Sequence, residues 1–175
     1  PLDGTNNYAF GIPFFCVNIA LVRGEEIILG ITYDPLRDEL FQAEKGRGAF
    51  LNGHPISVSK KTRVRDSFIG YDMGYDDEGG REILGVARRL WPNIYSLRVM
   101  GSAALGLAYA ACGRVDFYFH RFLYPWDIAS GILLVREAGG RVVGWGGEDA
   151  TIKNKGLIAS NEAIIGDFLG LVGKV

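Results

Sequence analysis

The first residues of the chain carry the groups that a metal-dependent phosphate site needs. The sequence opens Pro1-Leu2-Asp3-Gly4-Thr5-Asn6-Asn7-Tyr8. The Asp3 carboxylate is a hard oxygen ligand of the kind that magnesium prefers, and the Leu2 carbonyl can supply a second oxygen. Gly4 allows close approach to a ligand, the Gly4 and Thr5 amides can point at a phosphate, and the Thr5 hydroxyl can hold a water. The same string also fits an ordinary Asp-Gly turn, so alone it leaves both interpretations open.

A second aspartate stands where the pattern predicts the start of a helix. It belongs to the string Pro125-Trp126-Asp127-Ile128-Ala129-Ser130-Gly131. An aspartate in this place caps a helix and faces the positive end of its dipole, which is a structural role. Alternatively, Asp127 is a carboxylate ligand that its helix holds rigidly, while the small Ala129 and Gly131 let the helix pack closely. The two strings together favour one site built from both carboxylates.

The two strings resemble the paired signatures of the inositol monophosphatase family, which run Asp-Pro-Ile/Leu-Asp-Gly-Thr-x-Asn-Phe/Tyr and Trp-Asp-x-Ala-x-Gly. Three further segments are similar to the family, in the family's order: residues 45–53, with its Gly-x-Gly-Ala-x-x-Asn-Gly hairpin, residues 98–105, with its Arg-x-x-Gly-Ser-Ala-Ala helix start, and residues 137–140, Glu-Ala-Gly-Gly. The resemblance covers essentially the whole chain. It implies a magnesium-dependent, lithium-sensitive hydrolase that cleaves a phosphate monoester of inositol or a related sugar with a metal-activated water.

The resemblance also implies a role for each matching residue. Asp3, Asp127 and the Leu2 carbonyl would ligate magnesium, and Thr5 would help to polarise the attacking water. The Gly4 and Thr5 amides would hold the phosphate. The pocket for the substrate's hydroxyls would be lined by Gly101, Ser102 and Ala103. Family members are often dimers, so a homodimer is expected by analogy alone.

The start of the chain departs from the family pattern. The sequence begins at Pro1 without an initiator methionine, and the aspartate that precedes this proline in the family, with further acidic residues upstream, lies outside it. Residues 1–175 would then hold only part of the metal shell. We therefore expect them alone to be catalytically impaired. A rival interpretation is a non-catalytic truncated homologue that is kept for binding or assembly.

A second departure concerns specificity. The inositol enzymes usually carry a glutamate for a sugar hydroxyl where this chain has His120, followed by Arg121. These side chains could face a second phosphate, as in fructose 1,6-bisphosphate or a nucleotide 3′,5′-bisphosphate, or they could form a solvated loop. Fructose-1,6-bisphosphatase and 3′,5′-bisphosphate nucleotidase activities of the same superfamily therefore stay open as alternatives.

The elements that must position these residues divide the chain into two parts. Residues 1–65 predict an antiparallel meander that carries the first metal motif, with strands at 14–21, 27–33, 40–43 and 49–51 and a hairpin turn at Asn52-Gly53. Residues 66–175 predict an α/β half that carries the second motif, with strands at 67–71, 94–99, 115–119, 142–145 and 157–159 and helices at 78–90, 102–112, 127–138 and 161–172. This order indicates an α+β fold. The resemblance makes it the layered α-β-α-β-α sandwich of the inositol monophosphatase and fructose-1,6-bisphosphatase type.

Composition narrows the range of partners. The 175 residues include 19 basic and 20 acidic side chains, for a net charge of −1. This balance argues against nucleic acid polymers and anionic membrane surfaces, and it leaves small-molecule phosphate esters. No stretch is apolar enough to span a bilayer and we see no signal-peptide pattern, so the cytoplasm is the expected compartment. Cys16 and Cys112 predict small buried apolar side chains rather than a disulfide framework.

Overall fold

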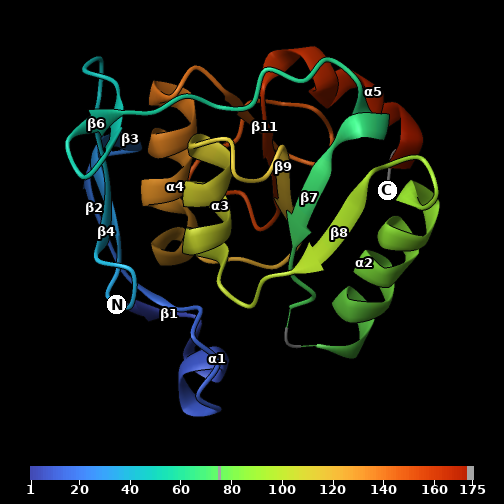
Figure 1. Ribbon diagram of the computed structural model, residues 1–175, viewed down its shortest axis with the longest axis horizontal. Helices are drawn as coiled ribbons and strands as arrows, with labels where there is room; N and C mark the ends of the chain where they lie inside the picture. The colour runs from blue at the N-terminus through green and yellow to red at the C-terminus, as the bar shows by residue number, and fades with distance from the viewer. Residues whose placement is uncertain (75, 173–175) are drawn as a thin grey trace.

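The computed structural model describes residues 1–74 and 76–172, which form a sandwich of alternating sheets and helices (Figure 1). Sheet A is antiparallel, in the order β1-β2-β3-β4-β5-β6. Its strands are β1 (Leu2–Asp3), β2 (Cys16–Arg23), β3 (Glu26–Asp34), β4 (Glu39–Glu44), β5 (Ala49–Leu51) and β6 (His54–Pro55). Sheet B is mixed, in the order β10-β11-β9-β7-β8. Its strands are β7 (Phe68–Tyr71), β8 (Ser96–Val99), β9 (Phe117–His120), β10 (Arg141–Val143) and β11 (Leu157–Ser160).

The helices fill the space between the two sheets and cover the far side of sheet B. Helices α3 (Ala103–Ala111) and α4 (Pro125–Glu137) lie between the sheets, and α2 (Asp77–Leu90) and α5 (Glu162–Val172) lie on the other face of sheet B (Figure 1). The remaining elements are the short helix α1 (Thr5–Ala9) and the 3-10 turn η1 (Val64–Asp66). The layered sandwich predicted from the sequence is confirmed, and the described residues supply four of its five layers.

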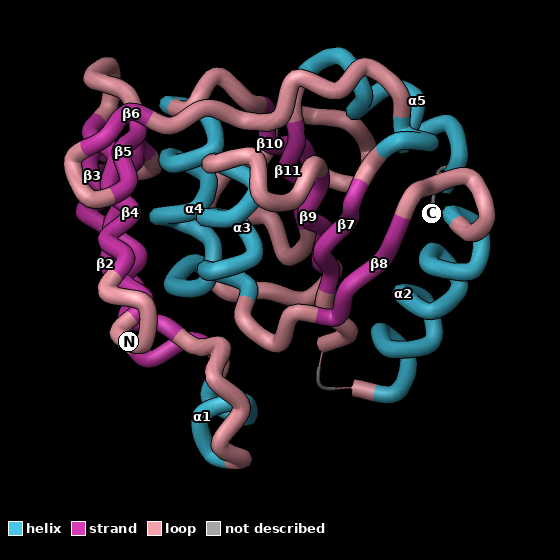
Figure 2. Tube along the Cα trace, viewed as in Figure 1, coloured by secondary structure: helices cyan, strands magenta, loops and turns pink. Residues whose placement is uncertain are grey.

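The alternating pattern of sheet A explains both its buried and its open face. On β2, Cys16 and Asn18 are buried, whereas Val17, Ile19 and Leu21 point the other way and are 40%, 52% and 58% exposed. Within residues 1–74 and 76–172, no helix covers that outer face (Figure 2). The predicted hairpin turn is confirmed, because Asn52 and Gly53 have φ angles of 49° and 78° and connect β5 to β6.

Sheet B creates the crevice in which a site can form. Strand β7 is parallel to both β8 and β9. The connection from β7 to β8 runs through α2 on one face, and the connection from β8 to β9 runs through α3 on the other face (Figure 1). In open α/β sheets, ligands bind where the connections change face, beyond the carboxyl ends of the strands. The residues that directly follow β7 and β8, and the last residue of β9, therefore face the expected site.

One of the two hydrophobic clusters found among the described residues joins the two parts of the chain. Phe41 and Ala43 of sheet A, the buried faces of α3 and α4, and Tyr118 of sheet B belong to one cluster. The close packing of α4 on α3 depends on Gly131, because a Cβ there would overlap the side chain of Leu107. The slim helix predicted from Gly131 is confirmed. The division near residue 65 stays a prediction, since this core is shared between both parts.

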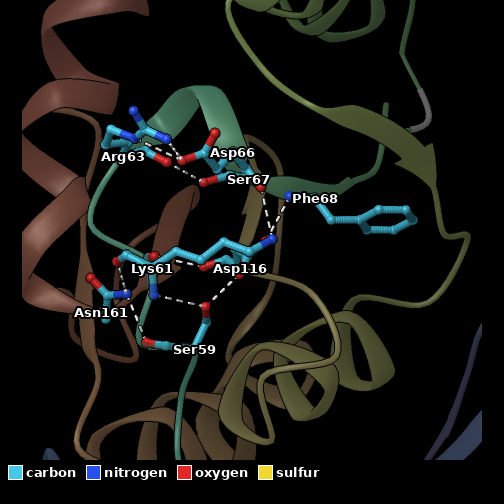
Figure 3. Close-up of polar contacts among 9 residues, drawn as sticks. Ser59, Lys61, Arg63, Asp66, Ser67, Phe68, Asp116 and Asn161 are labelled. Atoms are coloured by element: carbon cyan, nitrogen blue, oxygen red, sulfur yellow. Dashed lines mark hydrogen bonds and ion pairs between the residues drawn. The ribbon is translucent and has the colours of Figure 1, made fainter.

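A strap of residues 56–66 carries the chain from sheet A to sheet B, and Figure 3 shows how it is held. The buried Asp116 carboxylate accepts hydrogen bonds from the Ser59 hydroxyl, from Lys61 Nζ at 2.8 Å and from the Phe68 amide at 2.6 Å. Asn161 donates to the carbonyls of Ser59 (2.7 Å) and Lys61 (2.9 Å). One buried acid thus fixes the strap and the first residue of β7 together.

Most predicted elements are present, with some differences at their ends. Helix α4 begins at Pro125, so Asp127 occupies the third helical position; its side chain still caps the start of the helix, as expected, by accepting from the Tyr124 amide. Asp76 caps α2, since its side chain accepts from the Gly79 amide. Both cysteines are free, with Cys16 buried and Cys112 partly buried. Among the described helices, none is both long and apolar enough to cross a membrane.

Candidate active site

Three aspartates from distant parts of the sequence line one cavity of about 500 Å³. Asp3 ends β1, Asp72 follows β7, and Asp127 lies in the first turn of α4. The rest of the lining comes from the loops beside them: Pro1, Leu2, Gly4, Thr5, Asn6, Met73, Gly74, Val99, Gly101, Ser102, Ala103, His120, Phe122, Leu123, Tyr124 and Trp126. The cavity therefore gathers the residues that the sequence singled out for metal, phosphate or substrate binding, with the exception of Arg121.

Asp3 is held by the first turn of α3. Strand β1 pairs with β2 so that Asp3 lies opposite Cys16. Its Oδ2 accepts hydrogen bonds from the Ser102 hydroxyl and from the Ala104 amide at 3.1 Å. Burial raises the pKa of Asp3, and the negative charge of Asp127 adds to this rise. The charge of Asp127 therefore disfavours ionisation of the Asp3 carboxyl group.

Asp127 is fixed by its own helix and by a buried polar network. Its Oδ2 accepts from the Tyr124 amide at 2.9 Å, and burial raises its pKa. Asn18 of β2 donates to the Trp126 carbonyl at 2.8 Å, and its side-chain oxygen accepts from Thr32 and from Ser130 of α4. Sheet A thereby sets the position of the start of α4 and of the Asp127 carboxylate.

The donor atoms at this cavity fit a hard cation, but only in part. In Asp3 and Asp127, the side-chain hydrogen bonds found within residues 1–74 and 76–172 fall on Oδ2, which leaves Oδ1 of each for a ligand. Carboxylate and carbonyl oxygens are the ligands that magnesium prefers. No group of three or more His, Cys, Asp or Glu side chains suited to a metal occurs among the described residues. The oxygen set is therefore of the right chemistry and smaller than a complete shell.

The glycine of the first motif serves packing within the protein. Gly4 is buried at φ 78°, and a Cβ there would lie 3.0 Å from the Phe14 carbonyl oxygen and 3.1 Å from Ser102 Cβ. The close approach that requires glycine here is thus to Phe14 and Ser102 of the protein, whereas the sequence pattern predicted an approach to a ligand. Thr5 is the exposed first residue of α1 and lies on the cavity wall.

The segment 101–103 forms one wall of the cavity, but its residues differ in what they present. Gly101 has φ 80°, and Ala103 is the first residue of α3. The Ser102 hydroxyl caps α3 by accepting from the Leu105 amide at 3.3 Å and at the same time donates to Asp3. This hydroxyl is therefore engaged with the protein, and Ser102 acts on the site through Asp3.

His120 and Arg121 do not form a solvated loop, so that alternative is wrong. His120 is 4% exposed at the end of β9, and its Nδ1 accepts from the Phe122 amide at 3.0 Å. Burial lowers the pKa of His120 to about 4. Arg121 pairs with Glu82 at 2.9 Å and stacks over the Trp145 ring, away from the cavity lining. His120 thus offers the cavity a neutral imidazole, and the Arg121 charge is already matched.

Sequence reasoning missed Asp72, which is 7% exposed and lines the cavity. Its Oδ1 accepts from the amides of Met100 (3.0 Å) and Gly101, and its Oδ2 accepts from the Tyr118 hydroxyl at 2.7 Å. Burial raises the pKa of Asp72 to about 6. A positional signal could have found it, because Asp72 is the first residue after the strand predicted at 67–71 and such residues face the crevice of an α/β sheet.

A family model and two curated proteins are similar to this chain over nearly its whole length. The model of the inositol monophosphatase family matches residues 1–171. The chain is 41% identical over 175 residues to an inositol-1-monophosphatase of Mesorhizobium japonicum, covering 99% of this chain and 66% of the relative. It is 38% identical over 175 residues to a fructose-1,6-bisphosphatase/inositol-1-monophosphatase of Thermotoga maritima, covering 100% of this chain and 66% of that protein.

A solved structure agrees with these relatives. The extragenic suppressor protein suhB from Bartonella henselae superimposes with a TM-score of 0.94 at 42% identity, covering 99% of this chain and 67% of that one. The chain spans slightly less than two thirds of the length of the two curated relatives it matches.

Proposed function

The chain belongs to the inositol monophosphatase family, and from this premise we propose that it hydrolyses a phosphate monoester of inositol or a related sugar with magnesium as cofactor. One observation carries the proposal. Asp3 of the first motif and Asp127 of the second line the same cavity, although one comes from sheet A and the other from the start of α4. A pair of carboxylates in one cavity, each with an oxygen left for a ligand, suits cations that bind phosphate esters.

Asp3, Asp127 and the Leu2 carbonyl would hold magnesium. When bound, the metal neutralises charge on the phosphoryl oxygens and lowers the pKa of the attacking water. The chain's own residues set the geometry: Ser102 orients the Asp3 carboxylate, and the Tyr124 amide orients that of Asp127. The Thr5 hydroxyl, exposed on the cavity wall, would accept or donate a hydrogen bond to the water. The amides of Gly4 and Thr5 would donate to the phosphate.

The leaving alcohol would lie against the segment 101–103 and His120. Gly101 and Ala103 present backbone and small side chains, which leave room for a bulky polyol. The Nδ1 of His120 already accepts a hydrogen bond, so the neutral imidazole carries its proton on Nε2 and can donate it to a hydroxyl of the substrate. This residue would then take over the contact that a glutamate makes in the inositol enzymes.

A substrate with a single phosphate is favoured over a bisphosphate. A second phosphate needs a cationic partner, and the two residues considered for it are unsuited: the pKa of His120 is lowered to about 4, and Arg121 pairs with Glu82. The Thermotoga relative carries both activities in its name, so fructose 1,6-bisphosphate belongs in the test as the competing substrate. Lithium sensitivity and a homodimer stay predictions of the family resemblance, and a cytoplasmic location stays a prediction from the sequence pattern.

Phosphate release from inositol 1-phosphate and from fructose 1,6-bisphosphate, with and without magnesium, tests the proposal. The variants Asp3→Asn and Asp127→Asn should each lower kcat/KM by at least about 10²-fold, since they remove an anionic ligand that stabilises charge in the transition state. The exposed Asp167→Asn on α5 changes the same chemical group away from the site and should leave activity unchanged. Magnesium-independent turnover would refute the cofactor assignment. Magnesium binding without turnover of either ester would support a non-catalytic homologue instead.

A further inference from the structure

The turn at Met100–Gly101, which follows β8 and forms part of the cavity wall, is held from two sides. On one side, the Gly101 amide and the Met100 amide donate to Oδ1 of Asp72. On the other side, the Met100 carbonyl accepts from Nδ2 of Asn7 at 3.0 Å. Asn7 lies in the short helix α1, and its Nδ2 also donates to the Phe14 carbonyl at 2.7 Å. Residues from both parts of the chain therefore converge on one peptide unit.

The two amides that donate to Asp72 differ in whether they have a second acceptor. The Met100 amide also donates to the Tyr71 carbonyl at 3.0 Å, so it keeps an acceptor if Asp72 is lost. For the Gly101 amide, Asp72 is the acceptor found within residues 1–74 and 76–172. A buried amide without an acceptor is costly, and the turn would move to find one. Asp72 therefore determines where Gly101 lies.

The shape of the turn requires both a glycine and a closely fitting neighbour. Gly101 has φ 80°, which side chains other than glycine rarely adopt. A Cβ at this position would overlap the amide group of Asn7. The Asn7 side chain thus fills the space directly beside Gly101 and prevents the turn from shifting toward α1.

Asp72 is buried without a cation. It is 7% exposed, its remaining partner is the Tyr118 hydroxyl, and no salt bridge among the described residues includes it. Placing a carboxyl group in such surroundings costs free energy unless it accepts hydrogen bonds that need it. A buried acid of this kind on a cavity wall points to a role in fixing that wall.

We propose that Asn7 and Asp72 act as a pair of positioning residues, named here the turn clamp, that fixes Gly101 and Ala103 against the leaving alcohol of the substrate. The clamp acts through the turn and does not touch the reacting atoms. This inference rests on the proposed function, because it assigns the wall at 101–103 to the alcohol and not to the phosphate. Its consequence is selective: a loosened turn weakens binding of a polyol leaving group and spares binding of the phosphate.

The kinetic test compares two substrates that share a phosphate and differ in the leaving group. Inositol 1-phosphate presents several hydroxyls to the turn, whereas p-nitrophenyl phosphate presents none. The near-isosteric Asp72→Leu removes the acceptor and should raise the KM for inositol 1-phosphate about tenfold relative to the KM for p-nitrophenyl phosphate, as expected for one or two lost hydrogen bonds. Asn7→Ala should give a change in the same direction.

Matched variants separate the clamp from a general structural role. Asp72→Asn keeps an oxygen that can accept from both amides, so it should restore the KM ratio of the wild type. Tyr118→Phe removes the third hydrogen bond of Asp72 and leaves the other two, so it should affect stability and not the KM ratio. An equal loss with both substrates in Asp72→Leu and Asn7→Ala would overturn the proposal, because a merely structural defect acts on both.

A second measurement does not depend on activity. Hydrogen exchange followed by mass spectrometry should show faster exchange at the Gly101 amide in Asp72→Leu and wild-type exchange in Asp72→Asn. Unchanged protection in Asp72→Leu would overturn the clamp even if kinetics changed. If the wild type cleaves neither ester while the exchange result holds, the proposed function fails and the clamp does not. Should Asp72→Leu not fold, Asn7→Ala carries both measurements.

Discussion

The hydroxyl of Ser102 donates a hydrogen bond to Oδ2 of Asp3, so the first turn of α3 holds a carboxylate that belongs to sheet A. The same hydroxyl accepts from the Leu105 amide and thereby caps the helix. One oxygen atom thus couples the start of α3 to the orientation of a proposed metal ligand.

Replacing Ser102 by alanine is expected to weaken magnesium binding. Groups that orient a metal ligand typically contribute 10–100-fold to metal affinity or activity, so Ser102→Ala should raise the magnesium concentration for half-maximal activity by about tenfold or more. The loss of the cap should also cost about 1 kcal/mol of stability. Activity measured against magnesium concentration, together with thermal unfolding, gives both quantities.

Ser102→Thr is the matched control, because threonine keeps a hydroxyl that can both cap the helix and donate to Asp3. It should stay close to the wild type in both measurements. If Ser102→Ala loses stability and keeps its magnesium dependence, Ser102 is a helix cap and no more.

Much of the site could be predicted from the sequence, because its chemistry lies in short strings. Asp3 and Asp127 stand out by their neighbours, and the structure brings both to one cavity. Asp72 has no such string around it; its importance comes from its place at the end of a parallel strand, which depends on how strands far apart in sequence pair. The role of Asn7 depends on the contact with Met100, and a contact between residues so distant in sequence cannot be read from local patterns.

The fold shows the same division between local and non-local causes. The longer strands and the Asn52-Gly53 turn were predictable, since alternating apolar residues and positive φ angles are local properties, whereas the two-residue strands β1 and β6 were not predicted. The start of α4 was predicted two residues late, because Pro125 can occupy the first turn of a helix and Asp127 then falls at the third position. Helix α1 has only five residues, too few to show a helical period.

Removing the buried Asp116 carboxylate is expected to destabilise the protein strongly. In Asp116→Ala, the Lys61 ammonium, the Ser59 hydroxyl and the Phe68 amide lose their common acceptor (Figure 3). An unsatisfied buried donor costs about 1–3 kcal/mol, so we expect a loss of about 3 kcal/mol in urea unfolding. The exposed pair Arg63–Asp66 provides the control, since Asp66→Ala should cost less than about 1 kcal/mol. Equal losses in the two variants would contradict the anchoring role of Asp116.

Asp72 and His120 are expected to give opposite pH dependences of stability in the metal-free protein. Burial raises the pKa of Asp72 to about 6, so the native state binds more protons than the unfolded state, and the free energy of unfolding falls as pH rises from about 4 to 6. Burial lowers the pKa of His120 to about 4, so the native state binds fewer protons, and stability rises from about pH 4 to 6.5. In the wild type the two effects partly cancel.

Single variants should separate these two effects. Asp72→Asn leaves the contribution of His120 alone, so its stability should rise more steeply with pH than that of the wild type. His120→Asn, which keeps an acceptor for the Phe122 amide, should show the reverse. Thermal unfolding in EDTA between about pH 4 and 7 measures the slopes. Identical slopes in the wild type and Asp72→Asn would mean that Asp72 ionises at its ordinary pKa.

The outer face of sheet A is expected to make a polypeptide of residues 1–175 self-associate. Val17, Ile19 and Leu21 pair across to Tyr33, Ile31 and Leu29 of β3, which gives a continuous apolar surface. Apolar patches of this kind favour association. Ile19→Lys should therefore reduce both light scattering and the fluorescence of a bound hydrophobic dye. Leu84→Lys, at an equally exposed residue of α2, should change neither. Equal effects of both lysines would indicate a charge effect without a specific surface.

The same polypeptide is expected to need much more magnesium than its relatives. Magnesium prefers six oxygen ligands in near-octahedral geometry and releases its waters reluctantly. Asp3, Asp127 and the Leu2 carbonyl supply three, and among the described residues no cluster of three or more acidic, histidine or cysteine side chains adds to them. No further carboxylate is assigned to take the proton of the attacking water, a contribution worth about 10²–10⁴-fold.

Assayed at the same magnesium concentration, residues 1–175 should therefore be far less active than the full-length Mesorhizobium relative, of which they span 66%. Trimming that relative to the matching segment should lower its activity to a similar level. Equal activity of the short polypeptide and the full-length relative would show that the two carboxylates and one carbonyl suffice.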